Sequence, residues 1–170
     1  FMTNHDDSSQ TGSGQLRASD DLGRDPAKEK QAAAMLLTSP GKPFVYQGEE
    51  LGYWGNTSDG SDEYLRAPIV WNAAATDVAK GWTSKLDNTM LKGSISVETQ
   101  SADGESLLNV YKSWSRLRNT YPALAEGTMT AAPANSGAIA AWYMSSGSQK
   151  LLVIHNVASS EKTVTVSDSM

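Results

Sequence analysis

Residues 40–47 read Pro-Gly-Lys-Pro-Phe-Val-Tyr-Gln, and this stretch decides the fold. Its apolar centre lies between a Pro-Gly stop and a glycine-rich turn, which predicts a short buried strand. A helix is predicted just upstream, over residues 26–37, because Asp25 can cap it and Pro26 suits its first turn. Residues 1–4 have the pattern of an earlier buried strand, and a polar loop follows them. The order strand, loop, helix, strand predicts one right-handed unit of a parallel sheet, an α/β fold.

The downstream sequence divides into an irregular stretch and a helix. Residues 48–104 are irregular and carry three tryptophans among Gly, Asn, Ser and Asp, which is typical of a functional loop region. Residues 105–121 predict the clearest helix, because apolar side chains recur at three- and four-residue steps until Pro122 ends it. We expect packing rather than functional roles for four aromatic or imidazole side chains in and beyond this region: Trp71, Trp82, Trp114 and His155.

The C-terminal part has the pattern of a separate β domain. Short runs of strand-forming residues alternate with turns of Ser, Gly and Asn, which predicts an antiparallel all-β domain that ends before a sandwich is complete. The predicted strands are residues 127–131, 138–144, 150–157 and 162–166.

Composition excludes several classes of protein. The 170 residues are 39% hydrophobic and 19% charged, an ordinary globular balance. The net charge of −5 argues against nucleic acid or an anionic membrane surface as the main partner. The absence of cysteine excludes disulfides and thiolate metal sites, and no apolar run reaches the roughly 20 residues of a membrane span. Because the chain starts at Phe1 without a signal peptide, we expect a piece of a larger protein whose targeting signal lies upstream.

The strongest chemical signal is the triplet Asn4-His5-Asp6, directly after the first predicted strand. Polar side chains at the carboxyl end of a strand stand where α/β folds build their sites. A carboxylate there can hold sugar hydroxyls and stabilise positive charge on a sugar ring, and a histidine can bond the same sugar. Taken alone, the triplet fits turn chemistry equally well, with Asn and Asp bonding the local backbone.

Four segments, in order and at consistent spacing, resemble the α-amylase family of glycoside hydrolases. Residues 1–6 resemble its Phe-x-x-Asn-His-Asp segment after the seventh barrel strand, and residues 40–52 its Pro-Gly-x-Pro-x-x-Tyr-x-Gly-Glu-Glu-x-Gly segment through the eighth. Residues 66–71 resemble its Arg-x-Pro-Met-x-Trp segment, with Ile69 in place of Met. Residues 117–124 match the end of its eighth helix, Leu-Arg-x-x-x-Pro-Ala-Leu.

The resemblance implies the fold and the division of the chain. Residues 1–123 would be the C-terminal part of a catalytic (β/α)8 TIM barrel, and residues 124–170 the start of a C-terminal antiparallel β-sandwich domain, incomplete here.

The resemblance also implies roles for single residues. Asp6 matches the transition-state stabiliser, and His5 matches the histidine that binds the sugar at the cleavage site. Asn4 would orient this pair or contact the sugar. The family's nucleophile Asp and acid/base Glu follow its fourth and fifth strands and lie outside this chain, so we expect the chain alone to be inactive and poorly behaved in isolation.

Other polar and aromatic residues leave alternatives open. Tyr53 and Trp54 follow the segment that matches the family's eighth strand. Each of them either stacks on a sugar or packs under the loop. The arginine that the family often carries after the His-Asp pair is displaced or absent, and Arg17 or Arg24 could replace it. We expect structural roles for Glu49 and Glu50, through backbone bonds and arginine pairing, and solvated charges at Asp7, Asp20, Asp21 and Asp25.

The predicted function is a retaining glycoside hydrolase that acts on α-glucans such as starch and maltooligosaccharides. The alternatives are a transglycosylase or trehalose-forming isomerase on the same scaffold, a noncatalytic α-glucan-binding protein, and a plain β-domain interaction module. The expected partners are the glucan and the remainder of the barrel. We expect no cofactor or metal in this chain, with calcium held upstream where the whole enzyme binds it, and a secreted, periplasmic or cell-surface location rather than a cytoplasmic one.

Overall fold

The computed structural model describes residues 2–4, 16–55, 62–75, 93–134 and 136–165 of the 170-residue chain. The chain forms two compact units. The first unit comprises Phe1–Leu36 and Pro43–Ser113, and the second comprises Leu37–Lys42 and Trp114–Met170.

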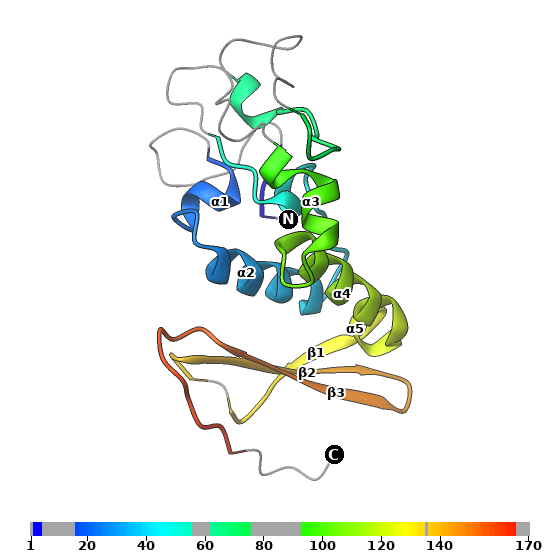
Figure 1. The fold of residues 1–170 in the computed structure, drawn as a ribbon. Helices are drawn as coiled ribbons and strands as arrows, with labels where there is room; N and C mark the ends of the chain where they lie inside the picture. Colours follow the sequence, from blue (N-terminus) through cyan, green and yellow to red (C-terminus); the bar gives the residue numbers. More distant parts are fainter. Residues whose placement is uncertain (1, 5–15, 56–61, 76–92, 135, 166–170) are drawn as a thin grey trace. The chain divides into compact units, whose positions relative to one another are not determined.

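The first unit is built from helices (Figure 1). The predicted helix over residues 26–37 is confirmed as α2, Pro26–Thr38. Asp25 caps it, because its carboxylate accepts a hydrogen bond from the Ala27 amide at 2.9 Å. In the described residues, the other helical elements of this unit are α1 (Ala18–Asp21), η1 (Glu49–Leu51), η2 (Asp62–Leu65), η4 (Gly93–Ile95), α3 (Val97–Ala102) and the first turns of α4 (Leu107–Thr120).

The core of the first unit collects apolar residues from the irregular stretch and from α4. Helix α4 confirms the predicted helix over residues 105–121, and Leu107, Leu108 and Tyr111 on its apolar face are buried. Further along the same helix Trp114 is only half-buried. The buried cluster consists of Leu51, Tyr53, Ala67, Val70 and Leu108, with Trp54, Ile69, Ala75, Ile95 and Val97 packed against it.

The strand predicted in residues 42–47 is wrong. Residues 42–46 form no strand, and Phe44 and Val45 are 57% and 37% exposed. A strand exists only where a neighbouring segment accepts its ladder hydrogen bonds, and no described segment pairs with these residues. Residues 2–4 likewise form no strand, while Phe1 lies outside the described residues.

The second unit contains a three-stranded antiparallel sheet. Figure 1 shows β1 (Thr128–Ala131), β2 (Ile139–Ser146) and β3 (Gln149–Asn156) side by side with β2 in the middle. Three of the four predicted strands are therefore confirmed. Gly147 makes the β2–β3 turn at φ 55°, and the strands pair from Ser146 opposite Gln149 to Ile139 opposite Asn156.

The fourth predicted strand is wrong over residues 162–165, and Val166 lies outside the described residues. Val164 instead packs on an apolar cluster of the sheet. The apolar pattern of this segment thus reflects cover over the sheet rather than pairing with it. That cluster consists of Ala132, Ile139, Ala141 and Tyr143.

The sequence pattern did not predict helix α5, Pro122–Glu126, because a proline after a helix also fits the end of that helix. Pro122 occupies the first position of α5, where a missing amide hydrogen does no harm. The helix packs on β2 and β3, where Ala123, Leu124, Trp142 and Met144 form a second buried cluster.

Two buried polar side chains, Arg118 and His155, bind residues 37–41 within the second unit. The guanidinium of Arg118, 5% exposed, donates to the carbonyls of Leu37 and Ser39 at 2.9 Å each, to that of Gly41, and to that of Ala125 at 3.2 Å. His155 contacts the Thr38 hydroxyl at 2.9 Å and lies 5.2 Å from the ring of Trp142. The predicted structural role of His155 is confirmed by this buried position.

Candidate active site

The two residues with the clearest predicted chemistry, His5 and Asp6, lie outside the described residues, as does Asp7. The structure does describe the residues that lead into them. Asn4 is half-buried, and Thr3 is fully buried. The Thr3 hydroxyl donates to Oε2 of Glu49 at 2.6 Å. The backbone just before the Asn-His-Asp triplet is therefore tied to a carboxylate 46 residues further along the chain.

Glu49 lies at the start of η1 and is 6% exposed. Its second carboxylate oxygen accepts a hydrogen bond from the Tyr111 hydroxyl at 2.8 Å. Burial raises the pKa of Glu49, and the hydrogen bonds from Thr3 and Tyr111 together with the charge of Arg17 oppose that shift. The structural role predicted for Glu49 is confirmed, with two hydroxyl groups as its hydrogen-bond donors in place of the expected arginine pairing.

Gly48 allows η1 to begin where it does. Its φ is 80°, and a Cβ at this position would lie 2.4 Å from the Tyr53 ring. Tyr53 itself is 1% exposed, accepts from the Val70 amide at 2.8 Å and donates to the Pro68 carbonyl at 3.2 Å. This position favours the packing alternative for Tyr53, because a buried ring presents no face to a sugar.

Arg17 is an internal brace. It is 1% exposed and donates to the carbonyl of Leu65 at 2.7 Å and to that of Gln47. Its guanidinium carbon lies 4.8 Å from the Tyr46 ring centroid, and burial lowers its pKa. With its bonds directed at backbone carbonyls, Arg17 is not the arginine that replaces the family's displaced one.

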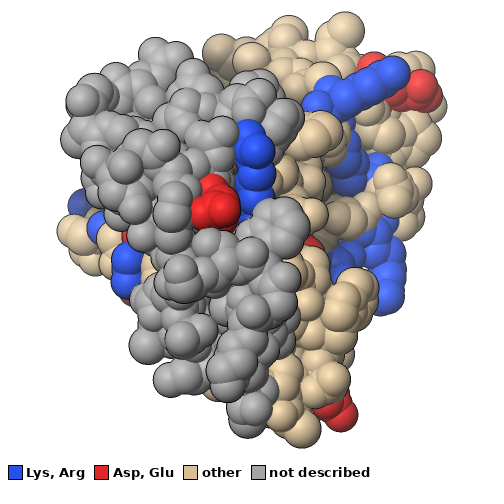
Figure 2. Space-filling view, turned by 90° about the horizontal axis from the view of Figure 1, so that it is seen from above, with Lys and Arg blue, Asp and Glu red and all other residues tan. Residues whose placement is uncertain are grey.

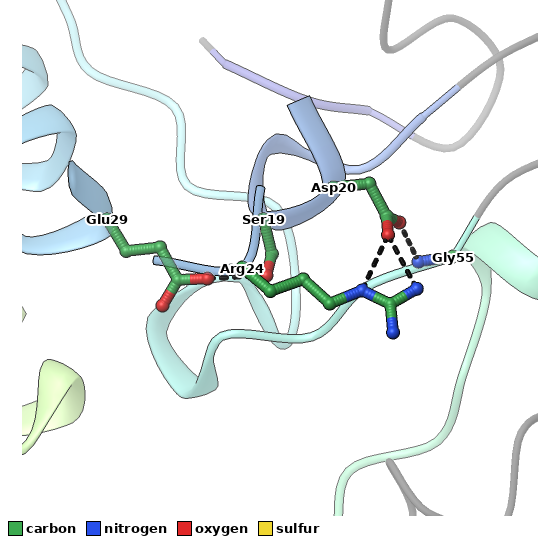
Figure 3. Close-up of polar contacts among 5 residues, drawn as sticks. All are labelled: Ser19, Asp20, Arg24, Glu29 and Gly55. Atoms are coloured by element: carbon green, nitrogen blue, oxygen red, sulfur yellow. Dashed lines mark hydrogen bonds and ion pairs between the residues drawn. The ribbon is translucent and has the colours of Figure 1, made fainter. Parts of the chain in front are cut away.

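Arg24 lies in a different setting, with its side chain 52% exposed. Figure 3 shows its guanidinium directed at the carboxylate of Asp20, which accepts from Nε at 2.9 Å and also from the Gly55 amide. The prediction of a solvated charge at Asp20 is wrong, because this carboxylate is 10% exposed and joins α1 to the chain at Gly55. Arg24 also lies over the Trp54 ring, 4.8 Å from its centroid.

Trp54 and Arg24 line an open cleft of about 340 Å³ in the first unit. The volume falls in the range of small-molecule sites. Figure 3 also shows that the Ser19 hydroxyl donates to the carboxylate of Glu29, a contact that joins α1 to α2 in the wall of the cleft. Polar side chains and one aromatic ring are the groups that hold sugars. The other polar lining residues include Lys30, Gln100, Asp103 and Glu105.

The structure describes Trp71, one of the two other tryptophans in the irregular stretch. Trp71 is 68% exposed, so the prediction that it packs in the interior is wrong: its neighbour Val70 takes the buried place while Trp71 points outward. Trp82 lies outside the described residues. The apolar pattern alone did not show which of two adjacent large side chains faces the core.

The described residues contain no group of three or more His, Cys, Asp or Glu side chains placed to hold a metal ion. Among them, no helix has both the length and the apolar character needed to cross a membrane. Lysine and arginine side chains occur together with acidic ones on the described part of the face drawn in Figure 2.

Sequence reasoning did not find the Thr3–Glu49–Tyr111 contact. Its members are 46 and 62 residues apart, and each fitted a local role, as strand, turn and helix face. A polar residue placed inside an apolar strand or on an apolar helix face was the available signal, since buried polar groups require partners.

In the described residues, a part built from helices is followed by an antiparallel sheet, an order compatible with the end of a barrel enzyme that carries a C-terminal β domain. The family model described as the α-amylase catalytic domain matches residues 1–127, and that of the α-amylase SusG C-terminal domain matches residues 139–170. The chain belongs to the α-amylase family. Its fold is the last part of the family's (β/α)8 barrel and part of the β domain that follows.

Individual relatives agree with this family. The chain is 44% identical over 176 residues to α-amylase SusG of Bacteroides thetaiotaomicron. The aligned region covers 99% of this chain and 24% of that protein. It is 31% identical to α-amylase 3 of Dictyoglomus thermophilum, over 96% of the chain and 30% of that protein. The chain thus spans about a quarter to a third of the length of these relatives.

Solved structures show the same fold. The α-amylase from H. orenii superimposes with a TM-score of 0.71 at 31% identity, over 84% of this chain and 28% of that chain. A trehalulose synthase superimposes with a TM-score of 0.68 at 21% identity, over 92% of this chain and 34% of that chain, a likeness of fold alone.

Proposed function

We propose that the whole protein is a retaining glycoside hydrolase that cleaves α-glucans such as starch and maltooligosaccharides. This chain supplies the transition-state-stabilising Asp6 and the sugar-binding His5. The observation that carries the proposal is the 44% identity, over 99% of the chain, to a protein named α-amylase. The family match includes the segment in which these two residues lie.

The proposed chemistry divides between this chain and the rest of the protein. Retaining glycosidases need a nucleophile and an acid/base about 5 Å apart, and they pass through a transition state with positive charge on the sugar ring. A fixed carboxylate such as that of Asp6 stabilises that charge, while His5 holds a hydroxyl of the same sugar. The nucleophile and the acid/base belong to the remainder of the barrel, so the 170-residue chain alone is inactive.

Further sugar contacts come from Asn4, Trp54 and Arg24. The proposal for Trp54 and Arg24 rests on their position in the wall of the 340 Å³ cleft. Arg24, half exposed, replaces the arginine that the family often carries after its His-Asp pair, because Arg17 is committed to backbone carbonyls. Replacing Arg24 with Ala should raise KM for long maltooligosaccharides more than for maltotriose.

A second candidate is transfer or isomerisation on the same scaffold. It is supported by matches to a 4-α-glucanotransferase of Thermotoga maritima, 33% identical over 69% of the chain, and to a trehalose synthase of Thermus thermophilus, 26% identical over 81%. These enzymes share the barrel but pass the glycosyl group to a sugar instead of water.

Product analysis on the full-length protein separates the candidates. Incubated with soluble starch and, separately, with maltose, a hydrolase releases reducing ends from starch, and proton NMR of the first products shows the α anomer. Longer maltooligosaccharides without a net gain in reducing ends indicate a transferase, and trehalose from maltose indicates an isomerase. Starch binding without any product contradicts catalysis and favours a binding protein.

The location and the metal requirement follow from the same proposal. An enzyme that degrades a polysaccharide too large to enter the cell acts outside the cytoplasm, so cell fractionation should find the protein secreted, periplasmic or at the cell surface. Calcium, if the whole enzyme needs it, is held by the remainder of the barrel. Activity lost with EDTA and restored by calcium, but not by magnesium, supports this assignment.

A further inference from the structure

Three polar side chains that are far apart in the sequence meet inside the first unit. Thr3, Glu49 and Tyr111 are 0%, 6% and 5% exposed. Thr3 donates to Oε2 of Glu49 at 2.6 Å, and Tyr111 donates to Oε1 at 2.8 Å, so each carboxylate oxygen has its own hydroxyl donor. The two hydroxyl groups come from opposite ends of the unit's sequence and bind one carboxylate between them.

This arrangement is more than filling of the core. A buried carboxylate loses its hydration, and the surrounding bonds seldom repay that loss compared with an apolar residue of the same size. An apolar residue would fill the space but would fix no hydroxyl group. What the carboxylate adds is direction: short bonds to a charged acceptor fix both donors in position.

Glu49 is itself held firmly. Its amide donates to the Tyr46 carbonyl at 2.9 Å, and the Gly48 carbonyl before it accepts from the Tyr53 amide at 2.9 Å. Tyr111 belongs to the buried face of α4. Thr3 is different, because it lies in a segment without regular secondary structure. The hydroxyl bond to Glu49 therefore ties an irregular segment to a fixed point.

We propose that Glu49 is a positioning residue for the reaction: through the Thr3 hydroxyl it holds the backbone that leads into Asn4, His5 and Asp6. Glu49 does not touch the substrate. The inference rests on the proposed function, since the group it serves is Asp6, three residues after Thr3 in the sequence. Catalytic groups must be held within a fraction of an ångström by supporting bonds, and a displacement of about 1 Å can lower the rate about 100-fold.

The test uses the full-length protein and two matched variants. Thr3→Val keeps the shape of the side chain and removes its hydroxyl. Tyr111→Phe removes the other hydroxyl bond to the same carboxylate, from an element not joined to the Asn-His-Asp triplet. Thr3→Ser restores the hydroxyl. Circular dichroism and the unfolding temperature establish that each variant is folded.

We expect Thr3→Val to lower kcat on maltooligosaccharides by about 10- to 100-fold with little change in KM, and Thr3→Ser to recover most of that loss. Tyr111→Phe should change kcat less than threefold, even when it lowers the unfolding temperature as much as Thr3→Val does. Equal losses of kcat in Thr3→Val and Tyr111→Phe would show that the contact is merely structural.

A double-mutant cycle tests the role of Glu49 directly. If Glu49 acts through Thr3, the Thr3→Val/Glu49→Gln protein is no slower than the slower single variant, whereas independent effects multiply. Asp6→Asn is measured alongside. An inactive wild type or a fully active Asp6→Asn variant overturns the proposed function. With those two controls as expected, unchanged kcat in Thr3→Val, or multiplied losses in the double variant, overturns only the positioning role of Glu49.

Discussion

The two units satisfy their buried backbone in different ways. In the second unit, antiparallel pairing along β2 and β3 satisfies the strands through neighbouring backbone groups. In the first unit, the described residues form helices joined by long irregular segments, and buried charged side chains supply hydrogen-bond partners to those segments. Arg17 bonds the carbonyls of Gln47 and Leu65, and Asp20 accepts from the Gly55 amide.

The difference shows where function can be built. In a paired sheet, hydrogen bonds between neighbouring strands fix the backbone, so the directions of the side chains are fixed as well. An irregular segment can follow any path, provided that distant side chains bond its backbone groups. In the first unit Arg17 bonds backbone carbonyls in this way. Glu49 instead holds Thr3, the residue that leads into the candidate site, through its side-chain hydroxyl.

The largest effect is expected at Arg118, a buried charge on which the second unit depends. Arg118→Met keeps much of the aliphatic stem but leaves the carbonyls of Leu37, Ser39, Gly41 and Ala125 without this donor. We expect a loss of more than about 3 kcal/mol in the free energy of unfolding. Arg116→Met, exposed on the same helix, should change it by less than about 0.5 kcal/mol. Urea unfolding, with hydrogen exchange of the β2 and β3 amides, measures the free energy of unfolding of both variants. Similar small losses in the two variants would contradict the structural role of Arg118.

Substitutions of two glycines at positive-φ turns, one in each unit, compare how closely other atoms pack at the two turns. Gly48 and Gly41 have φ of 80° and 90°, but only at Gly48 would a Cβ meet another group, the Tyr53 ring at 2.4 Å. Gly41→Ala should cost about 1 kcal/mol, the cost of the left-handed backbone alone. Gly48→Ala should cost about 2–3 kcal/mol, because the ring must also move. Equal shifts of the unfolding temperature would contradict the close packing at η1.

His155 gives the second unit a pH dependence of its own. Burial lowers the pKa of this imidazole below its usual value of 6.5. The folded state therefore binds the proton more weakly than the unfolded state does. The stability from neutral His155 is fully present above about pH 6.5 and is lost as the pH falls through the lowered pKa.

His155→Gln should remove part of this acid sensitivity. Between pH 7.5 and 4.5 the unfolding temperature of the wild type should fall further than that of the variant. Parallel curves for the two proteins would show that His155 does not titrate on unfolding.

The smallest effect concerns a cap in the first unit. The Ser96 hydroxyl accepts from the Thr99 amide at 3.1 Å at the start of α3. Ser96→Ala should cost about 1 kcal/mol. Ser94→Ala, two residues earlier and exposed, should cost almost nothing. Chemical denaturation of the two variants compares them, and indistinguishable midpoints would contradict the capping role.

What the sequence predicted well was local. Asp25 and Pro26 marked the start of α2, the periodic apolar residues marked α4, and turns of Ser and Gly separated three real strands. In each case the signal lies within a few residues of the structure that it forms. The strand predicted in residues 42–47 failed because a strand depends on a partner segment, which no local pattern contains.

In the candidate site, too, the sequence predicted local features but not contacts between distant residues. The motif match identified Asp6 and His5 by resemblance, and these assignments stay predictions. The contact of Thr3 with Glu49 and of Asp20 with Gly55 could not be predicted, because each joins residues 46 or 35 positions apart. A buried polar residue announces that it needs a partner, but its sequence does not say which one.

The most direct test of the central claim is starch hydrolysis by the full-length protein, its Asp6→Asn variant and the matched Asp7→Asn variant. Both variants remove one negative charge from adjacent positions, so they separate the role of Asp6 from a general effect of charge. We expect Asp6→Asn to lower the release of reducing sugar by at least about 1,000-fold with the fold intact, and Asp7→Asn to stay within about threefold of the wild type. An Asp6→Asn variant as active as the wild type would contradict the account.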